Sequence, residues 1–218
     1  MMLKLSFLIY FFILTSSALY GVYSFTKLKY PYRVLVVLIV LSCIKELVDK
    51  MVYTNSSDGN YLNHFLLILT LVLNLFIYLP QWGNDDRLKR NVLVITLSFF
   101  VFIVLNIIYF QGLLVNPTNN FVFLCIQMVG LSLLSFKVII NSPADESIYK
   151  KPLFWLSVSN LFFYNVVYLI LTCFHFFKSS GVLGEWIPFV SVYANYFLYS
   201  GYIVAIYFHK INQNVQHR

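Results

Sequence analysis

Charged residues are scarce in this sequence, where Asp, Glu, Lys and Arg together make up 11% of 218 residues. Soluble domains carry about 25% of such residues. A surface this poor in charge cannot keep a chain of this size in aqueous solution, and the mean hydropathy of +0.78 agrees. The composition therefore excludes an ordinary soluble domain and predicts a protein that works within or beside a lipid bilayer.

Cysteine is also scarce, and each of the three residues lies inside an apolar run: Cys43, Cys125 and Cys173. No Cys-x-x-Cys spacing occurs. We interpret these residues as small buried hydrophobic side chains rather than as disulfides or metal ligands.

Common catalytic motifs are missing too, since the sequence has no Gly-x-Ser-x-Gly motif, P-loop or His-x-x-x-His pair. A zinc site needs three or four ligands brought together. His64 and His175 with Glu46 or Asp49 could supply that number at one depth, which leaves a metal-dependent intramembrane enzyme as an alternative. The last apolar run contains no His, and we predict no metal and no cofactor.

Long apolar runs fill most of the chain, which is 60% hydrophobic. A membrane-spanning helix needs about 20 mostly apolar residues, and breakers such as Asn116-Pro117 and Ser142-Pro143 separate runs of that length. The predicted fold is all-α, a single domain over residues 1–218 that forms an integral membrane bundle of seven transmembrane helices. The predicted helices cover residues 5–25, 33–53, 61–80, 91–112, 120–140, 152–177 and 187–208.

The basic residues indicate the orientation of this bundle, because Lys and Arg concentrate in cytoplasmic loops. Eleven of the 15 lie in or beside alternate connections and the C-terminal tail: Lys27, Lys29, Arg33, Arg87, Lys89, Arg90, Lys137, Lys150, Lys151, Lys210 and Arg218. We therefore predict an N-terminus outside and a C-terminus in the cytoplasm. The same placement accounts for the net charge of +7 without nucleic acid as a partner.

A cleaved signal peptide is the competing interpretation of residues 1–25, where Lys4 and an apolar run precede Ser16-Ser17-Ala18. Cleavage would leave the basic residues at 27, 29 and 33 outside, opposite to the later basic loops. We favour an uncleaved first helix.

Polar side chains inside a bilayer are costly and therefore indicate function. The second predicted helix is the least apolar, with Lys45 spaced i,i+4 from Asp49 and Glu46 spaced i,i+4 from Lys50. This cluster lies about 18 Å along the helix from Arg33, in the outer half of the membrane. The short Glu46 side chain cannot reach far toward water, so we expect it to face the bundle interior.

Other predicted helices carry polar residues at a similar depth, including the stripes Ser157, Asn160, Tyr164, Tyr168 and Ser191, Asn195, Tyr199, Tyr202. One hypothesis is an outward-opening polar pocket formed by Glu46, Asp49, His64, Gln127, Tyr168 and Asn195. The alternative is that most of these residues form interhelical hydrogen bonds, worth about 0.6 kcal/mol each. Asp49 and Lys50 could also be a solvated helix end.

Several short motifs give the chain a resemblance to a known group. They are Glu46, Asn63-His64, Arg87-Leu88-Lys89-Arg90, Pro152-Leu153-Phe154-Trp155-Leu156-Ser157 and Phe163-Tyr164. With them the chain resembles small, mostly uncharacterised seven-helix membrane proteins of Bacteroidota, often encoded beside or fused to sensor histidine kinases. The resemblance implies a bacterial plasma (inner) membrane and a histidine kinase or other membrane or cytoplasmic partner. It supplies no catalytic residues, and the chain carries no kinase domain of its own.

We therefore expect a sensory or accessory module that binds a small molecule or lipid in the outer half and signals to a separate partner. A small-solute transporter or channel is the second hypothesis and requires a continuous polar path. Apolar runs at 34–41, 92–95 and 131–134 interrupt such a path, although the sixth and seventh predicted helices offer hydroxyls and amides there. An intramembrane enzyme is the third.

Overall fold

A computed structural model describes residues 2–51, 59–83, 85–141, 147–178 and 186–216, with side chains over a slightly narrower range. Across these residues the chain forms seven long α-helices and no β-strand, which confirms the all-α prediction. The helices are α1 (Met2–Ser24), α2 (Tyr30–Met51), α3 (Gly59–Tyr78), α4 (Asp86–Asn106), α5 (Thr118–Asn141), α6 (Pro152–Lys178) and α7 (Trp186–Gln216).

Single residues account for the starts of α2 and α4, at Tyr30 and Asp86, ahead of the predicted residues 33 and 91. Pro31 lies in the first turn of α2 rather than between helices, because proline lacks only an N–H that the first turn leaves unbonded anyway. At the start of α4, the Asp85 side chain accepts a hydrogen bond of 3.0 Å from the Leu88 backbone N–H. This N-cap makes the predicted basic loop at 87–90 the first turn of a helix.

The helical segment of α4 ends within one residue of the prediction, whereas α7 ends well beyond it. α4 continues into a π-helical turn, Ile107–Gln111, which Gly112 ends with a φ of 67°. α7 continues to Gln216, so His209 belongs to this helix, contrary to the expectation of a seventh helix without His. The reason is that residues 209–216 include no Gly or Pro to stop the helix. The last two residues of the predicted 33–53 helix lie outside the described residues.

Six of the helices are long and apolar enough to cross a membrane: Leu5–Lys27, Asn60–Trp82, Asp86–Gln111, Thr118–Asn141, Pro152–Cys173 and Phe189–Gln213. α2 is long enough to cross a membrane but carries too many charged residues to count among them: Arg33, Lys45, Glu46, Asp49 and Lys50. These six segments indicate a multi-pass membrane protein in contact with the lipid bilayer.

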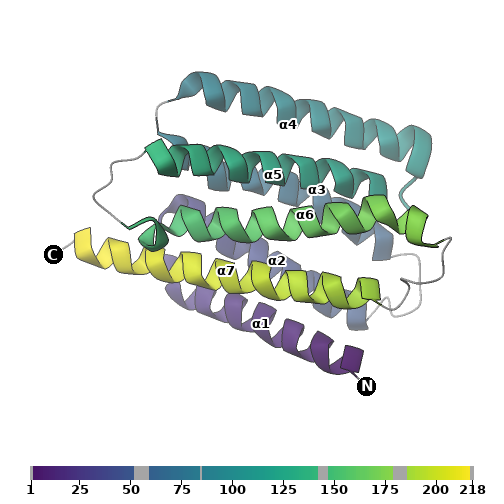
Figure 1. The fold of residues 1–218 in the computed structure, drawn as a ribbon, viewed down its shortest axis with the longest axis horizontal. Coiled ribbons are helices and arrows are strands. Elements are labelled where there is room, and N and C mark those ends of the chain that lie inside the picture. Colours follow the sequence, from purple (N-terminus) through teal and green to yellow (C-terminus); the bar gives the residue numbers. More distant parts are fainter. Residues whose placement is uncertain (1, 52–58, 84, 142–146, 179–185, 217–218) are drawn as a thin grey trace.

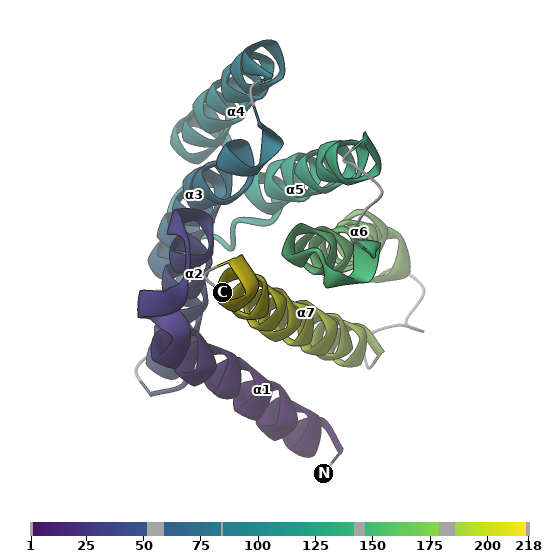
Figure 2. The ribbon, with the colours of Figure 1, turned by 90° about the vertical axis from the view of Figure 1, so that its left-hand side faces the viewer.

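The helices pack as a closed ring of six with one helix outside it. In the ring, α1 packs on α2, α2 on α3, α3 on α5, α5 on α6, α6 on α7, and α7 on α1 (Figure 2). α4 lies outside, against α3 and α5, and exposes apolar side chains such as Leu93, Leu97 and Phe102. Successive helices run in opposite directions, so the two termini lie at opposite ends of the bundle (Figure 1).

α6 and α7 approach each other closely where Gly201 lies against Ser159. A side chain on Gly201 would place its Cβ only 2.5 Å from the Ser159 Cβ. Small residues commonly allow transmembrane helices to approach this closely. Gly201 therefore fixes the spacing of the two helices that form one wall of the interior.

Candidate functional site

A cavity of about 420 Å³ lies inside the ring, in the half of the bundle where α2 ends and α3, α5 and α7 begin. All six helices of the ring contribute to it, as does the connection that precedes α5. This volume falls within the usual range for small-molecule sites. Its polar and charged lining residues are Tyr10, Ser42, Lys45, Glu46, Asn63, Thr70, Asn116, Tyr164, Ser191, Asn195, Tyr199 and Tyr202.

The charged wall of the cavity comes from α2. Lys45 Nζ lies 2.6 Å from Asp49 Oδ2, as the i,i+4 spacing predicts, and 3.8 Å from Glu46 Oε1. The other predicted pair does not form in the part of the chain that the structure describes, because Lys50 Nζ lies over the Phe7 ring, 5.2 Å from its centroid. Glu46 therefore faces the cavity, and its nearest paired cation is Lys45, which lies closer to Asp49 than to Glu46.

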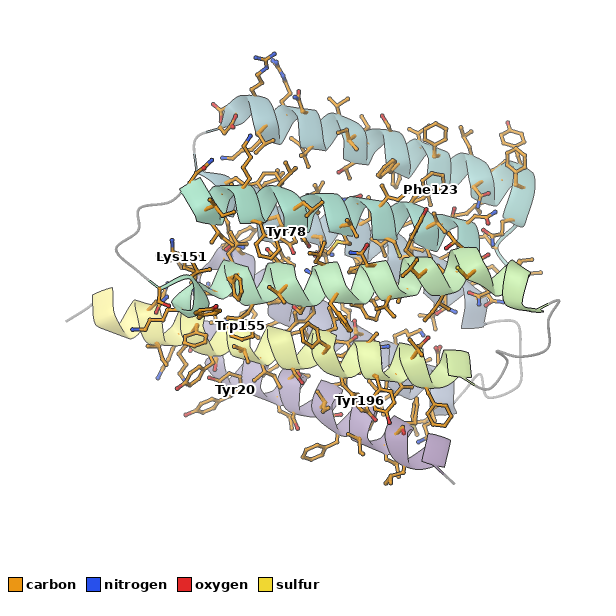
Figure 3. All side chains as sticks on the ribbon, viewed as in Figure 1. Tyr20, Tyr78, Phe123, Lys151, Trp155 and Tyr196 are labelled. Atoms are coloured by element: carbon orange, nitrogen blue, oxygen red, sulfur yellow. The ribbon has the colours of Figure 1, made fainter. Side chains whose placement is uncertain are left out.

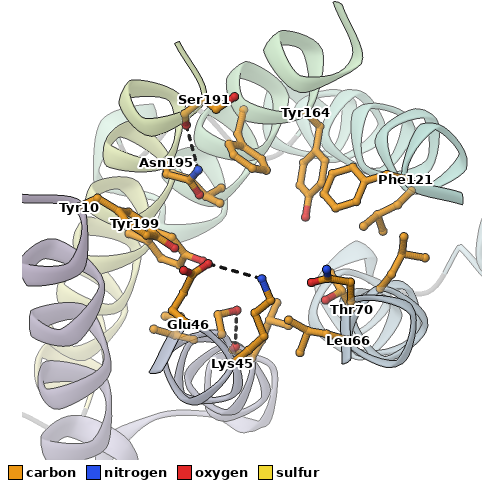
Figure 4. A pocket seen from close by; sticks show the side chains of 18 of the residues that line it. Tyr10, Lys45, Glu46, Leu66, Thr70, Phe121, Tyr164, Ser191, Asn195 and Tyr199 are labelled. Carbon is orange, nitrogen blue, oxygen red and sulfur yellow. Dashed lines mark hydrogen bonds and ion pairs between the residues drawn. The ribbon is translucent and has the colours of Figure 1, made fainter. Parts of the chain in front are cut away.

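Aromatic rings surround this carboxylate. Tyr10 and Tyr199 lie next to Glu46, with their ring centroids 6.0 Å apart (Figure 4). Tyr164 and Phe121 face the cavity from α6 and α5 on the opposite side. The cavity is thus amphipathic, because its charged groups lie on α2 while aromatic and aliphatic side chains form much of the remaining wall.

Hydrogen-bonded amides hold the α4–α5 connection over this end of the bundle. Asn106 Nδ2 donates to Asn120 Oδ1 at 2.8 Å, and Gln111 Nε2 donates to the Asn116 carbonyl at 2.6 Å. The His64 ring bonds the Val115 carbonyl at 3.0 Å. Asn116, which lines the cavity, is therefore fixed from α3, α4 and α5.

A buried chain of polar groups runs from the floor of the cavity into the other half of the bundle. The Tyr202 hydroxyl, on the cavity wall, donates to Asn160 Oδ1 at 2.6 Å. Asn160 Nδ2 donates to the Tyr78 hydroxyl at 2.7 Å. The Tyr78 hydroxyl in turn lies 3.4 Å from Ser132 Oγ. Tyr78 lies deep between the helices (Figure 3). Four helices are thereby joined below the cavity.

A second cluster joins helices at the end of the bundle where α7 terminates. The Tyr32 hydroxyl donates to Gln81 Oε1 at 2.8 Å, and the Tyr32 ring stacks on His209 at 4.0 Å between centroids. His209 Nε2 accepts from the Lys29 backbone N–H at 3.1 Å. These contacts link α2, α7 and the segment after α3.

The six residues of the predicted pocket fall into three groups. Glu46 and Asn195 line the cavity, and Asp49 holds Lys45, which lines it. His64 and Gln127 are buried elsewhere, where His64 bonds the α4–α5 connection and Gln127 Nε2 donates to the Leu71 carbonyl at 3.4 Å. Tyr168 lies on the exposed surface.

Several lining residues were not singled out from the sequence, notably Tyr10, Ser42, Thr70 and Phe121. Tyr10 had a usable signal, because α1 runs antiparallel to α2 and its third turn reaches the level of Glu46. Phe121 had none, since an aromatic residue in a membrane helix ordinarily faces lipid or a neighbouring helix.

Known proteins offer no match. No family model, curated protein or solved structure is significantly similar to this sequence.

The described residues hold no group of three or more His, Cys, Asp and Glu side chains placed to bind a metal ion. The side chain of His175, which the metal alternative requires, lies outside the described residues.

Proposed function

We propose that this protein is a sensory or accessory module that binds a small molecule or lipid in the cavity and signals to a separate partner. The supporting observation is the cavity itself, a chamber of about 420 Å³ with Lys45 and Glu46 on one wall. Sites for small ligands typically combine an apolar lining with a few convergent polar groups, and this cavity has that composition.

We further propose that all seven helices cross the bacterial plasma membrane, with the N-terminus outside. The support is the distribution of charge, since basic residues gather at the end of the bundle where α7 terminates: Lys27, Lys29, Arg33, Arg87, Lys89, Arg90, Lys150, Lys151 and Lys210. Such clustering marks the cytoplasmic side. α2 would cross as part of the ring, where its charged turn faces the cavity instead of lipid.

The output of the module would pass through the buried polar chain. A ligand that displaces Tyr202 also disturbs Asn160 and Tyr78, and so α6 and α3. Signalling of this kind requires that the ligand favour one arrangement of the helices over another. We propose a histidine kinase, or another membrane or cytoplasmic protein, as the partner, in line with the resemblance of the motifs at 46, 63–64 and 152–157.

Filling the cavity should abolish ligand binding. Thr70 faces the cavity from α3 (Figure 4), so the larger ring in Thr70→Phe should displace a bound molecule. The substitution leaves the backbone hydrogen bonds of α3 in place. We expect native mass spectrometry of the protein from mild detergent to detect one bound small molecule or lipid in the wild type and none in Thr70→Phe.

The matched control for this experiment is Ser98→Phe, which adds the same ring on the exposed face of α4. It should keep the bound molecule at wild-type occupancy. Equal occupancy in Thr70→Phe and the wild type would contradict the proposal, because the ligand would then lie outside the cavity.

The buried polar chain also favours a second candidate, a small-solute transporter, because it carries hydroxyls and amides beyond the cavity floor. Its groups are bonded to one another, however, and fully buried Leu131 and Ile77 lie beside it. Flux of a solute into liposomes that contain the purified protein, absent from Thr70→Phe liposomes, would favour transport over sensing.

A further inference from the structure

The charges on α2 beside the cavity are unevenly paired. Lys45 and Glu46 line the cavity, and Asp49 holds Lys45. Lys50 lies over the ring of Phe7, which also lines the cavity. The 2.6 Å contact commits Lys45 mainly to Asp49, because its 3.8 Å separation from Glu46 is beyond hydrogen-bonding range. Glu46 is left as the polar group of this wall whose charge is least compensated.

The i,i+4 spacing offers Lys50 as a partner for Glu46, but that ion pair does not form among the described residues. Lys50 is one helical turn further on, and its ammonium lies over the Phe7 ring. In the part of the chain that the structure describes, the ion pairs within 4.0 Å both involve Lys45. Charge interactions are strong in a medium of low dielectric constant, so a cation that enters the cavity gains by binding beside Glu46.

The rest of the cavity suits a cation with an apolar body. The faces of aromatic rings attract cations, and Tyr10, Tyr199, Tyr164 and Phe121 line the chamber. Asn195 Nδ2 is already bonded to the Ser191 carbonyl at 2.9 Å, which leaves the Asn195 side-chain oxygen as an acceptor for an N–H donor. An anion would instead meet the Glu46 carboxylate, and the cation on this wall, Lys45, is already held by Asp49 at 2.6 Å.

We infer that the ligand of this cavity is an organic ammonium ion with an apolar or aromatic body, bound through Glu46. This inference rests on the proposed function and names the chemical class of its ligand. The amine can belong to a free small molecule or to the headgroup of an aminolipid, since both present the same charged group.

The test compares three probes of matched size in uncharged dodecyl maltoside micelles. Phenethylamine is cationic, phenethyl alcohol is neutral and phenylacetate is anionic. Isothermal titration calorimetry of the full chain should show that phenethylamine binds at least about tenfold more tightly than the other two. Phosphatidylethanolamine added to the micelles should compete with phenethylamine if the source is a lipid headgroup and should not compete if it is a free amine.

Two variants on the charged wall should change the affinity in opposite directions. Glu46→Gln removes the negative charge and keeps the shape, so it should weaken phenethylamine binding about tenfold or more. Lys45→Gln removes the competing cation and should strengthen binding, by up to about tenfold. A loss of folding alone cannot produce both results.

Matched charge changes at the other end of the bundle control for long-range electrostatics. Asp86→Asn and Lys137→Gln alter exposed residues of α4 and α5, and both should leave the affinity unchanged. Binding of the alcohol or the acid as tight as that of the amine, or an unchanged affinity in Glu46→Gln, would overturn the inference. So would an absence of phenethylamine binding to the folded protein at millimolar concentrations.

The same titrations on Thr70→Phe distinguish failure of the cationic-ligand inference from failure of the proposed function. If the neutral or anionic probe binds and Thr70→Phe abolishes that binding, the cavity is a ligand site and only the cationic class is wrong. If phenethylamine binding survives Thr70→Phe, the site lies outside the cavity, and both the proposed function and the inference fail.

Discussion

Replacement of Gly201 by alanine should destabilise the bundle by about 1–3 kcal/mol, although alanine is the better helix former. The added Cβ would lie 2.5 Å from the Ser159 Cβ and 2.7 Å from its Oγ. Ser159 cannot yield by rotating its side chain, because its Cβ is fixed by the backbone of α6. Its hydroxyl is also held by the Trp155 carbonyl at 2.7 Å. α6 and α7 must therefore move apart. Unfolding in mixed micelles with increasing dodecyl sulfate, followed by circular dichroism, measures the change.

The same substitution at Gly130 is the matched control. A Cβ at Gly130 meets nothing within 4 Å, so Gly130→Ala should be neutral or slightly stabilising. Removal of the clashing partner should rescue the first variant, and Ser159→Gly combined with Gly201→Ala should recover most of the lost stability. Equal stability of Gly201→Ala and Gly130→Ala would show that the α6–α7 contact tolerates a methyl group.

The helices were predictable from sequence because their signals are local. A run of about 20 apolar residues between breakers leaves a membrane protein few other structures, and the predicted spans at 120–140 and 152–177 lie within two residues of α5 and α6. The errors in the predicted helix boundaries arise where one capping side chain, or the lack of a helix-breaking residue, decides where a helix begins or ends. Asp85 caps α4 ahead of its apolar run, and no breaker ends α7 after residue 208.

The site was harder to predict, because depth in a membrane can be read from sequence but rotation about the helix axis cannot. Glu46 and Asn195 share a level and both reach the cavity. Gln127 faces α3 and bonds the Leu71 carbonyl. Tyr168 follows the stripe of Asn160 and Tyr164, yet it is exposed where those residues are buried. Which face of a helix a neighbour covers depends on the packing of the whole ring, including the exclusion of α4 from it.

The ion pairs of α2 also depend partly on local spacing and partly on packing between helices. The i,i+4 rule places two possible pairs on α2, and only the Lys45–Asp49 pair forms among the described residues. The choice depends on Phe7, which belongs to α1 and gives Lys50 an aromatic ring to lie over. A contact between residues this distant in sequence cannot be read from spacing on one helix, yet it leaves Glu46 facing the cavity.

Replacement of Asn160 by alanine should lower the free energy of unfolding by about 2–3 kcal/mol. Asn160 is fully buried and joins Tyr202 to Tyr78 through hydrogen bonds of 2.6 and 2.7 Å. Alanine would leave both tyrosine hydroxyls in the bundle interior without this partner, and the cost of stranding them exceeds the value of the two bonds. Tyr202→Phe, which leaves the bond between Asn160 and Tyr78 in place, should cost about 1 kcal/mol.

Asn165→Ala is the matched control on the same helix, because Asn165 is exposed and its side chain bonds the Leu161 carbonyl one turn earlier. It should change the stability by a few tenths of a kcal/mol. Losses of similar size in Asn160→Ala and Asn165→Ala would show that the buried chain adds little to the joining of α3, α6 and α7. The expected difference would instead show that the hydrogen bonds of Asn160 hold α3, α6 and α7 together directly beneath the cavity.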